Sequence, residues 1–163
     1  MLIGVVSDTH GHVANARLAV RMLESMKVEA VLHCGDIGST AIVPLFADWP
    51  THFVFGNVDD GRHVAELRSA IEEAGQVCHG RFGSLEFGGV KVALMHGDDE
   101  RLLEQTIAEG KHQIVCHGHT HVPRREQIGP TLVLNPGALY RAARHTIAVV
   151  ELPAVKAEII AVE

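Results

Sequence analysis

Three histidines alternate along the segment "IVCHGHTHVP", at positions 117, 119 and 121, directly after a short apolar run. In an extended chain, alternate side chains point to the same face, so these imidazoles can lie side by side. Histidine is the side chain that most often binds metal ions in proteins. The segment is therefore either a polar turn that happens to contain histidine or one part of a metal site, and the rest of the chain has to distinguish the two.

Polar residues also follow five other apolar runs of the chain. The motifs at these places are "SDTH", "HCGD", "FGNVD", "MHGDD" and "LNPG". Each motif alone could be a turn or a helix cap. Together they put aspartate, histidine and asparagine at the C-terminal ends of successive predicted strands, which is where open α/β sheets bind ligands. The series therefore favours a site that several strands build jointly.

The first half of the chain alternates between strand and helix patterns. We expect strands at Leu2–Ser7, Ala30–His33 and His52–Phe55, and helices at Val13–Met26, Ala41–Ala47 and Val64–Ala74. The helices are predicted from apolar residues spaced three and four apart. This βαβαβα order predicts parallel strands joined by right-handed crossovers.

The second half is predicted to be richer in strands. Gly88 and Gly89 mark a hairpin within "SLEFGGVKVALM", and Asp98 or Asp99 can cap a helix over Arg101–Glu109. Four more strands are expected at Gln113–Cys116, Thr131–Leu134, Thr146–Leu152 and Val155–Val162. We expect most of these strands to pair antiparallel. Because no linker or repeat divides the chain, residues 1–163 are predicted to form one α/β domain of two packed sheets with helices outside.

Composition narrows the class of protein. Apolar residues make up 47% of the chain and charged residues 21%, as is typical of soluble globular proteins. No segment has the roughly 20 apolar residues that span a bilayer, and the first residues do not resemble a signal peptide. The three cysteines form no CxxC pair, so we expect reduced thiols and a cytoplasmic location. The net charge of −6 argues against a dedicated nucleic-acid-binding surface but allows a phosphate substrate, because bound cations reverse the local field.

The ordered motifs resemble those of the calcineurin-like metallophosphoesterase superfamily, and their spacing resembles its small bacterial and archaeal phosphodiesterases. The matching motifs are Asp8-x-His10, Gly35-Asp36, Gly56-Asn57-x-Asp59, His96-Gly97 and Gly118-His119-Thr120-His121. The resemblance implies a four-layer αββα sandwich of two mixed sheets with flanking helices. It also implies two divalent metal ions and a phosphoester hydrolase.

The resemblance assigns seven metal ligands to this chain. Asp8, His10 and His121 would bind the first ion, Asn57, His96 and His119 the second, and Asp36 both. Asp36, Asn57 and His96 are also the predicted catalytic residues. Carboxylate, amide and imidazole donors suit Mn²⁺, the ion we expect, with Fe²⁺, Co²⁺, Ni²⁺ and Zn²⁺ as alternatives. The implied reaction is hydrolysis of a small phosphodiester by a hydroxide that bridges the two ions.

Three positions depart from the family pattern. Val58 stands where many relatives have a proton-donating histidine, Asp98 replaces a second histidine, and Ala138 replaces a serine. Because valine cannot donate a proton to a departing oxygen, a phosphodiesterase is favoured over a phosphomonoesterase.

Four further residues are candidates for supporting roles. Arg144 and Asp59 are candidates for phosphate contact and ligand support. His33 and His117 lie outside the ligand pattern and either orient a ligand or belong to the structural core.

Two other functions stay open at this point. One is a phosphomonoesterase or nucleotide phosphatase, which Val58 disfavours. The other is a catalytically silent protein-binding scaffold, like the retromer subunit that shares this fold, which the complete set of ligand positions disfavours. We expect no membrane association, and the oligomeric state, including a homo-oligomer, is left open.

Overall fold

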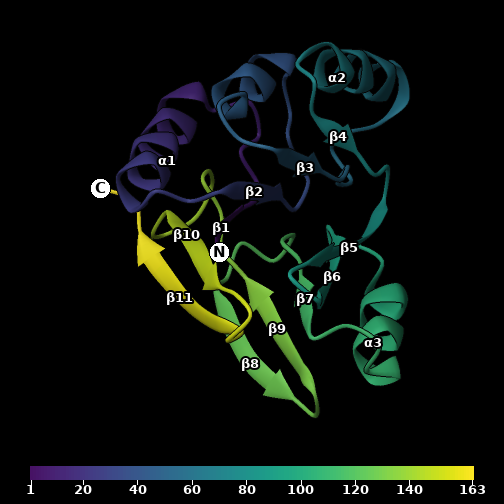
Figure 1. The fold of residues 1–163 in the computed structure, drawn as a ribbon. Helices are drawn as coiled ribbons and strands as arrows, with labels where there is room; N and C mark the ends of the chain where they lie inside the picture. The colour runs from purple at the N-terminus through teal and green to yellow at the C-terminus, as the bar shows by residue number, and fades with distance from the viewer.

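The computed structural model describes residues 1–163 as two mixed β-sheets packed face to face, with helices on both outer surfaces (Figure 1). The strand order is β11-β10-β1-β2-β3-β4 in the first sheet and β5-β6-β7-β9-β8 in the second. The predicted four-layer αββα sandwich is therefore confirmed. None of the helices has the length and apolar character that a membrane-spanning helix needs.

The first sheet contains the parallel strands predicted for the first half of the chain. Its strands are β1 (Leu2–Val6), β2 (Ala30–His33), β3 (Thr51–Phe53), β4 (Val77–Cys78), β10 (Thr146–Glu151) and β11 (Lys156–Ala161). Strands β1 to β4 are parallel, whereas β10 and β11 pair antiparallel at one side. The crossovers are α1 (Val13–Met26), the 3₁₀ helix η1 (Thr40–Phe46) and α2 (Gly61–Glu73).

The second sheet is more parallel than we predicted. Its strands are β5 (Phe82–Phe87), β6 (Val90–Met95), β7 (Ile114–Cys116), β8 (Arg124–Ile128) and β9 (Thr131–Asn135). The pairs β5–β6 and β8–β9 are antiparallel as expected, but the central pairs β6–β7 and β7–β9 are parallel. Helix α3 (Glu100–Glu109) supplies the crossover that lets β7 run parallel to β6.

The hydrophobic core lies in three layers. Leu23, Phe46 and Leu67 fill the space between the first sheet and its helices. Strand β1 is buried on both faces, since Val6 belongs to that layer while Ile3 and Val5 pack between the sheets. A thinner layer under α3 contains Ala93, Met95 and Val115 of the second sheet. Burial on both faces explains why β1 and β2 are continuous apolar runs in the sequence.

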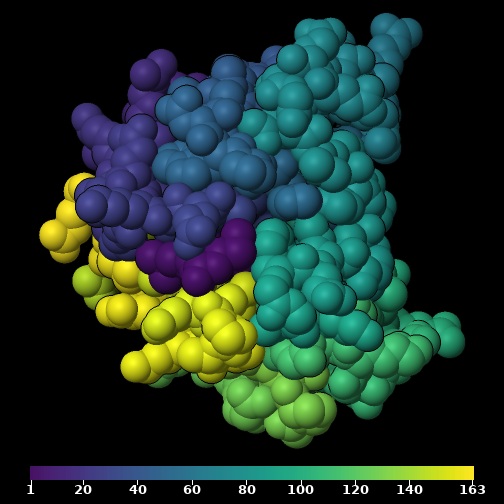
Figure 2. Space-filling view, in the orientation of Figure 1, coloured from purple at the N-terminus to yellow at the C-terminus, as the bar shows by residue number.

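The two ends of the chain meet in the first sheet. Strand β10 pairs with β1, and the surface shows purple N-terminal residues directly against yellow C-terminal ones (Figure 2). This pairing also places the loop before β10 beside the end of β1, because the Leu139 N–H donates to the Ser7 carbonyl (3.2 Å). The late loop therefore reaches the same region as the first polar motif.

Candidate metal centre

The first two ligand candidates follow β1 on a tightly turned loop. Asp8 and His10 have φ of 54° and 44°, in the left-handed region where Asp and His are tolerated better than most residues. The Oδ2 atom of Asp8 accepts hydrogen bonds from the Ser7 hydroxyl (2.5 Å) and the His119 N–H (3.2 Å). Its Oδ1 atom is buried and has no hydrogen-bond partner. A buried carboxylate oxygen without a partner is costly, so this atom indicates a place for a cation.

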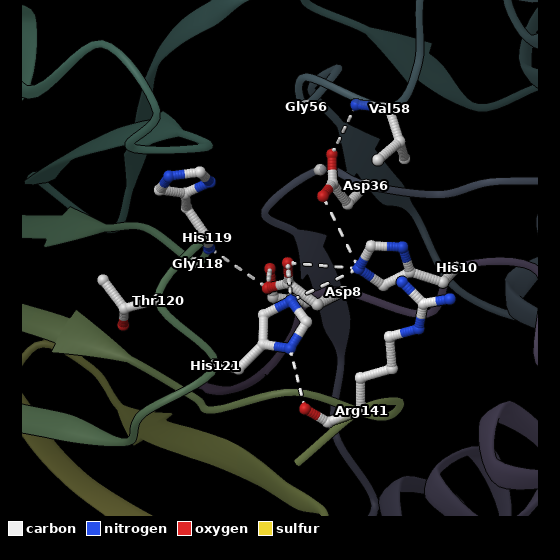
Figure 3. A network of polar contacts seen from close by, with 12 residues as sticks. Asp8, His10, Asp36, Gly56, Val58, Gly118, His119, Thr120, His121 and Arg141 are labelled. Carbon is white, nitrogen blue, oxygen red and sulfur yellow. Dashed lines mark hydrogen bonds and ion pairs between the residues drawn. The ribbon is translucent and has the colours of Figure 1, made fainter.

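Two imidazoles face this oxygen from separate loops (Figure 3). The Nε2 atoms of His121 and His10 lie 3.1 and 3.8 Å from Asp8 Oδ1 and 3.3 Å from each other. The Nδ1 of His121 donates to the Arg141 carbonyl (3.1 Å), which leaves the Nε2 lone pair directed at the group. Three donor atoms thus converge at one point.

Asp36 lies between this first group and a second one. Its Oδ2 is 3.5 Å from His10 Nε2, and its Oδ1 is 3.3 Å from His96 Nε2. Oδ1 also accepts the Val58 N–H (3.0 Å). One oxygen of Asp36 therefore faces each group, as a bridging ligand requires.

The second group contains the remaining candidates. Asn57 Oδ1 is 3.1 Å from both His96 Nε2 and His119 Nδ1. His96 Nδ1 donates to the Cys34 carbonyl (2.8 Å), so its Nε2 lone pair also points inward. His96 is buried, whereas Asn57 and His119 are exposed, so this side of the centre opens to solvent. The structure thus brings all seven predicted ligands together.

Close approach of the loops depends on two glycines. A Cβ atom at Gly56 would overlap the Asp36 carboxylate, and one at Gly118 would overlap the Ser7 hydroxyl. Any side chain at these positions would displace a ligand candidate or the residue that orients it.

The charge state of the two carboxylates follows from their contacts. Burial alone would raise the pKa of Asp36. In the metal-free protein His96 also carries a proton on Nε2, and its hydrogen bond and charge, together with the Val58 N–H, outweigh burial and hold the pKa of Asp36 below its usual value. Burial is likewise outweighed at Asp8, where contacts with His10 and Ser7 keep the pKa low. Both groups are therefore anionic at neutral pH and suited to a cation.

The predicted supporting residues differ in their roles. Asp59 accepts the N–H groups of Ile37, Gly38 and Gly56 (2.9–3.0 Å), so it holds the loops after β2 and β3 together. Both of its carboxylate oxygens are thus engaged by backbone N–H groups of the loops that carry Asp36 and Asn57. Arg144 is exposed, lines the same surface cavity as His121, and forms no side-chain hydrogen bond or ion pair.

The three departures from the family pattern differ in burial and contacts. The Val58 side chain is 37% exposed, so it does not belong to the core. Asp98 forms an ion pair with Arg81, whose guanidinium also donates to the Phe55 carbonyl. Ala138 is fully buried. Arg81 and Ser7 were not singled out from the sequence, although Ser7 stands directly before the first ligand motif.

His33 holds two of the ligand loops together. It is fully buried, its Nδ1 accepts the Gly35 N–H (3.2 Å), and its Nε2 contacts the Thr9 hydroxyl (3.0 Å). Burial lowers the pKa of His33 to about 4, and burial likewise lowers the pKa of His117 to about 4. Both rings are therefore neutral inside the protein, and His33 orients ligand loops from behind.

The low pKa of His33 predicts acid sensitivity of the metal-free protein. In the unfolded chain His33 binds a proton below about pH 6.5, whereas in the folded protein it binds one only below about pH 4. Acidification between these two values therefore favours unfolding. Between about pH 7 and about pH 5 this residue should remove roughly 2 kcal/mol from the free energy of unfolding. Urea unfolding in chelator should show a smaller loss for His33→Gln than for the wild type. Equal losses would contradict this role.

Comparison with known proteins places the chain in a family. A model described as the calcineurin-like phosphoesterase superfamily domain matches residues 1–154. The chain belongs to this superfamily. It is 34% identical over 140 residues to Phosphodiesterase MJ0936 of Methanocaldococcus jannaschii, covering 84% of this chain and 83% of that protein. The structure of an archaeal phosphodiesterase superposes with a TM-score of 0.90 at 30% identity, covering 99% of both chains.

The fold is also found in a solved structure with lower sequence identity. Vacuolar Protein Sorting 29 from Cryptosporidium parvum superposes with a TM-score of 0.68 at 21% identity, covering 98% of this chain and 95% of that one, and shares the fold alone. The family and the closer relatives confirm the predicted resemblance and identify the chain as a phosphoester hydrolase of a metal-dependent family.

Proposed function

We propose that this protein is a phosphodiesterase whose active site binds two divalent metal ions. The observation that carries the proposal is the position of Asp36, with one carboxylate oxygen facing each group of donors. The unpartnered Oδ1 of Asp8 supports the same conclusion, because a cation would satisfy it. Seven donors are also more than one ion of this kind normally binds.

One ion would be held by Asp8, His10, His121 and Asp36. The other ion would be held by Asp36, Asn57, His96 and His119. Acidic, amide and imidazole donors without thiolates favour Mn²⁺, with Fe²⁺, Co²⁺, Ni²⁺ or Zn²⁺ as alternatives. Such a pair of ions lowers the pKa of a bound water and neutralises charge on the phosphoryl oxygens.

The residues of the chain orient this chemistry. His96 and His121 each donate one ring N–H to a backbone carbonyl, which fixes the direction of the other nitrogen. Asp59 joins the loops that carry Asp36 and Asn57, and His33 joins the loop of Asp36 to Thr9 in the first ligand motif. Since Asn57 and His119 are exposed, we propose that the phosphoryl group enters from their side.

The preference for diesters is inferred from the missing proton donor. Val58 cannot protonate a departing oxygen, and the nearby Asp98 is paired with Arg81. The similar protein MJ0936 is named a phosphodiesterase, which supports the same preference. We further propose that residues 1–163 act as one catalytic domain, since both sheets contribute residues to a single site. The cytoplasmic location stays a prediction.

This proposal predicts a clear dependence on the substrate. With Mn²⁺, the protein should hydrolyse bis-p-nitrophenyl phosphate readily and alkyl phosphomonoesters poorly, because a nitrophenolate leaves without a proton donor whereas an alkoxide does not. A positioned acid typically accelerates such steps by ~10²–10⁴-fold. Val58→His should therefore raise kcat/KM for an alkyl ester more than for an aryl ester, and the exposed side chain leaves room for the ring.

The control is the exposed Val77 on β4, because Val77→His adds a histidine in the first sheet without changing the site. The measured quantity is the ratio of kcat/KM values for alkyl and aryl esters. A wild-type protein that already cleaves both at equal rates would show that another residue donates the proton. A protein without metal-dependent turnover of any diester would contradict the proposed function.

A further inference from the structure

A cavity of about 650 Å³ adjoins the exposed side of the candidate metal centre. It shares His119 with that centre, includes Gly97 next to His96, and extends along α3 to Ile128 at the end of β8. Leu103 and Ile107 of α3 form one apolar wall, and Val122 lies opposite. Val122 is 62% exposed, the highest value among the large apolar side chains of the protein. An apolar cavity continuous with a phosphate site is suited to an organic group attached to that phosphate.

A buried polar atom also lacks a partner at this cavity. His117 lines the cavity, is only 3% exposed, and its Nε2 atom forms no hydrogen bond. Its other ring nitrogen, Nδ1, lies 3.1 Å from the Gly118 carbonyl. Because Nε2 is closed to solvent, a group in the cavity does not reach it, and His117 contributes to the cavity wall without offering a hydrogen bond.

The charges around the cavity restrict what it can bind. Glu100 and Glu104 of α3 line it, and neither forms an ion pair. Arg124 is its only basic residue, and its guanidinium is bound by Glu126 (2.6 Å). The side chains of the cavity are therefore net acidic away from the metal centre, which opposes a second phosphate or a carboxylate at the far end of the ligand.

We propose that this cavity binds one organic arm of the phosphodiester substrate, an uncharged alcohol residue with an apolar body. The inference rests on the proposed function, and it names the class of diester. In hydrolysis the oxygen of water bonds to phosphorus, the bond from phosphorus to one alcohol oxygen breaks, and that alcohol leaves with a proton. The cavity selects diesters with a compact apolar arm over polynucleotides and other polyanions.

The test uses binding of phosphonates, which cannot be hydrolysed. On the Mn²⁺-loaded protein, phenylphosphonate should bind about tenfold more tightly than methylphosphonate by calorimetry, because only the ring reaches the cavity. Ala108→Trp fills the cavity from the exposed face of α3 and should abolish this preference. The matched control Ala65→Trp, at an exposed position of α2, should keep it.

A second variant tests the charge of the cavity without filling it. A 4-carboxyphenylphosphonate should bind more weakly than phenylphosphonate to the wild type, and Glu104→Lys should remove that difference. Equal affinities for the phenyl and methyl compounds, or no binding of either, would overturn the inference. If the protein prefers phenylphosphonate but hydrolyses no diester, the binding role of the cavity is supported and the proposed phosphodiesterase function is rejected.

Discussion

Replacing Asp36 with asparagine is expected to lower kcat/KM for bis-p-nitrophenyl phosphate by roughly 10³-fold. In the wild type, each carboxylate oxygen of Asp36 faces one of the two groups of ligand candidates. Asparagine has nearly the same shape, but it has only one oxygen, which is uncharged, and an NH₂ group in place of the other. The loss of shared charge should cost about 4 kcal/mol of transition-state stabilisation, which corresponds to that decrease in rate.

The matched control for this variant is Asp60→Asn. Asp60 is an exposed aspartate at the start of α2 whose side chain forms no capping hydrogen bond. It lies three residues from Asn57, so the two variants make the same chemical change in neighbouring parts of the fold. Activity of Asp60→Asn should match the wild type. If Asp36→Asn also retained activity at saturating Mn²⁺, Asp36 would not be a shared ligand.

Removal of metal is expected to lower the melting temperature by roughly 5–10 °C. Without a cation, the imidazole nitrogens of His10, His96 and His121 lie 3.1–3.8 Å from carboxylate oxygens of Asp8 and Asp36, and the buried Asp8 Oδ1 has no hydrogen-bond partner. An ion present at ~100 times its dissociation constant stabilises the folded state by about 2.7 kcal/mol. Each kcal/mol corresponds to roughly 2–4 °C in a chain of this size.

The measurement is thermal unfolding in chelator, followed by addition of Mn²⁺ in excess. Mn²⁺ should restore the wild-type melting temperature, and it should raise that of His121→Ala by a smaller amount. The same melting temperature with and without metal would argue that the folded protein binds no ion at this site.

The sequence predicts most of this fold because its buried strands are long apolar runs. Strands β4 and β8 were not predicted from the sequence, and each has a physical reason. Strand β8 reads "RREQI" and lies at the edge of the second sheet, where charged side chains face solvent and no apolar alternation marks it. Strand β4 has two residues, too few for any periodicity. Parallel pairing of β6 with β7 depends on the position of α3, which local sequence does not specify.

The convergence of the ligand candidates could be predicted from the sequence, but the contacts that hold their loops together could not. Ligand motifs stand directly after strands, so their convergence follows from the sheet topology. Asp59 bonds three N–H groups from two loops, and His33 bonds a threonine 24 residues away, so neither role is visible in local spacing. The cavity beside His119 requires α3 to pack opposite the loop after β7. Its existence depends on tertiary packing alone.

The most direct test of the central claim is the number of metal ions bound per chain. Protein reconstituted with Mn²⁺ and freed of excess ion should contain close to two equivalents by elemental analysis. Asn57→Ala and His96→Ala remove donors from the second group only, and each should reduce the content toward one equivalent. One equivalent in the wild type, unchanged in both variants, would contradict a two-metal centre bridged by Asp36.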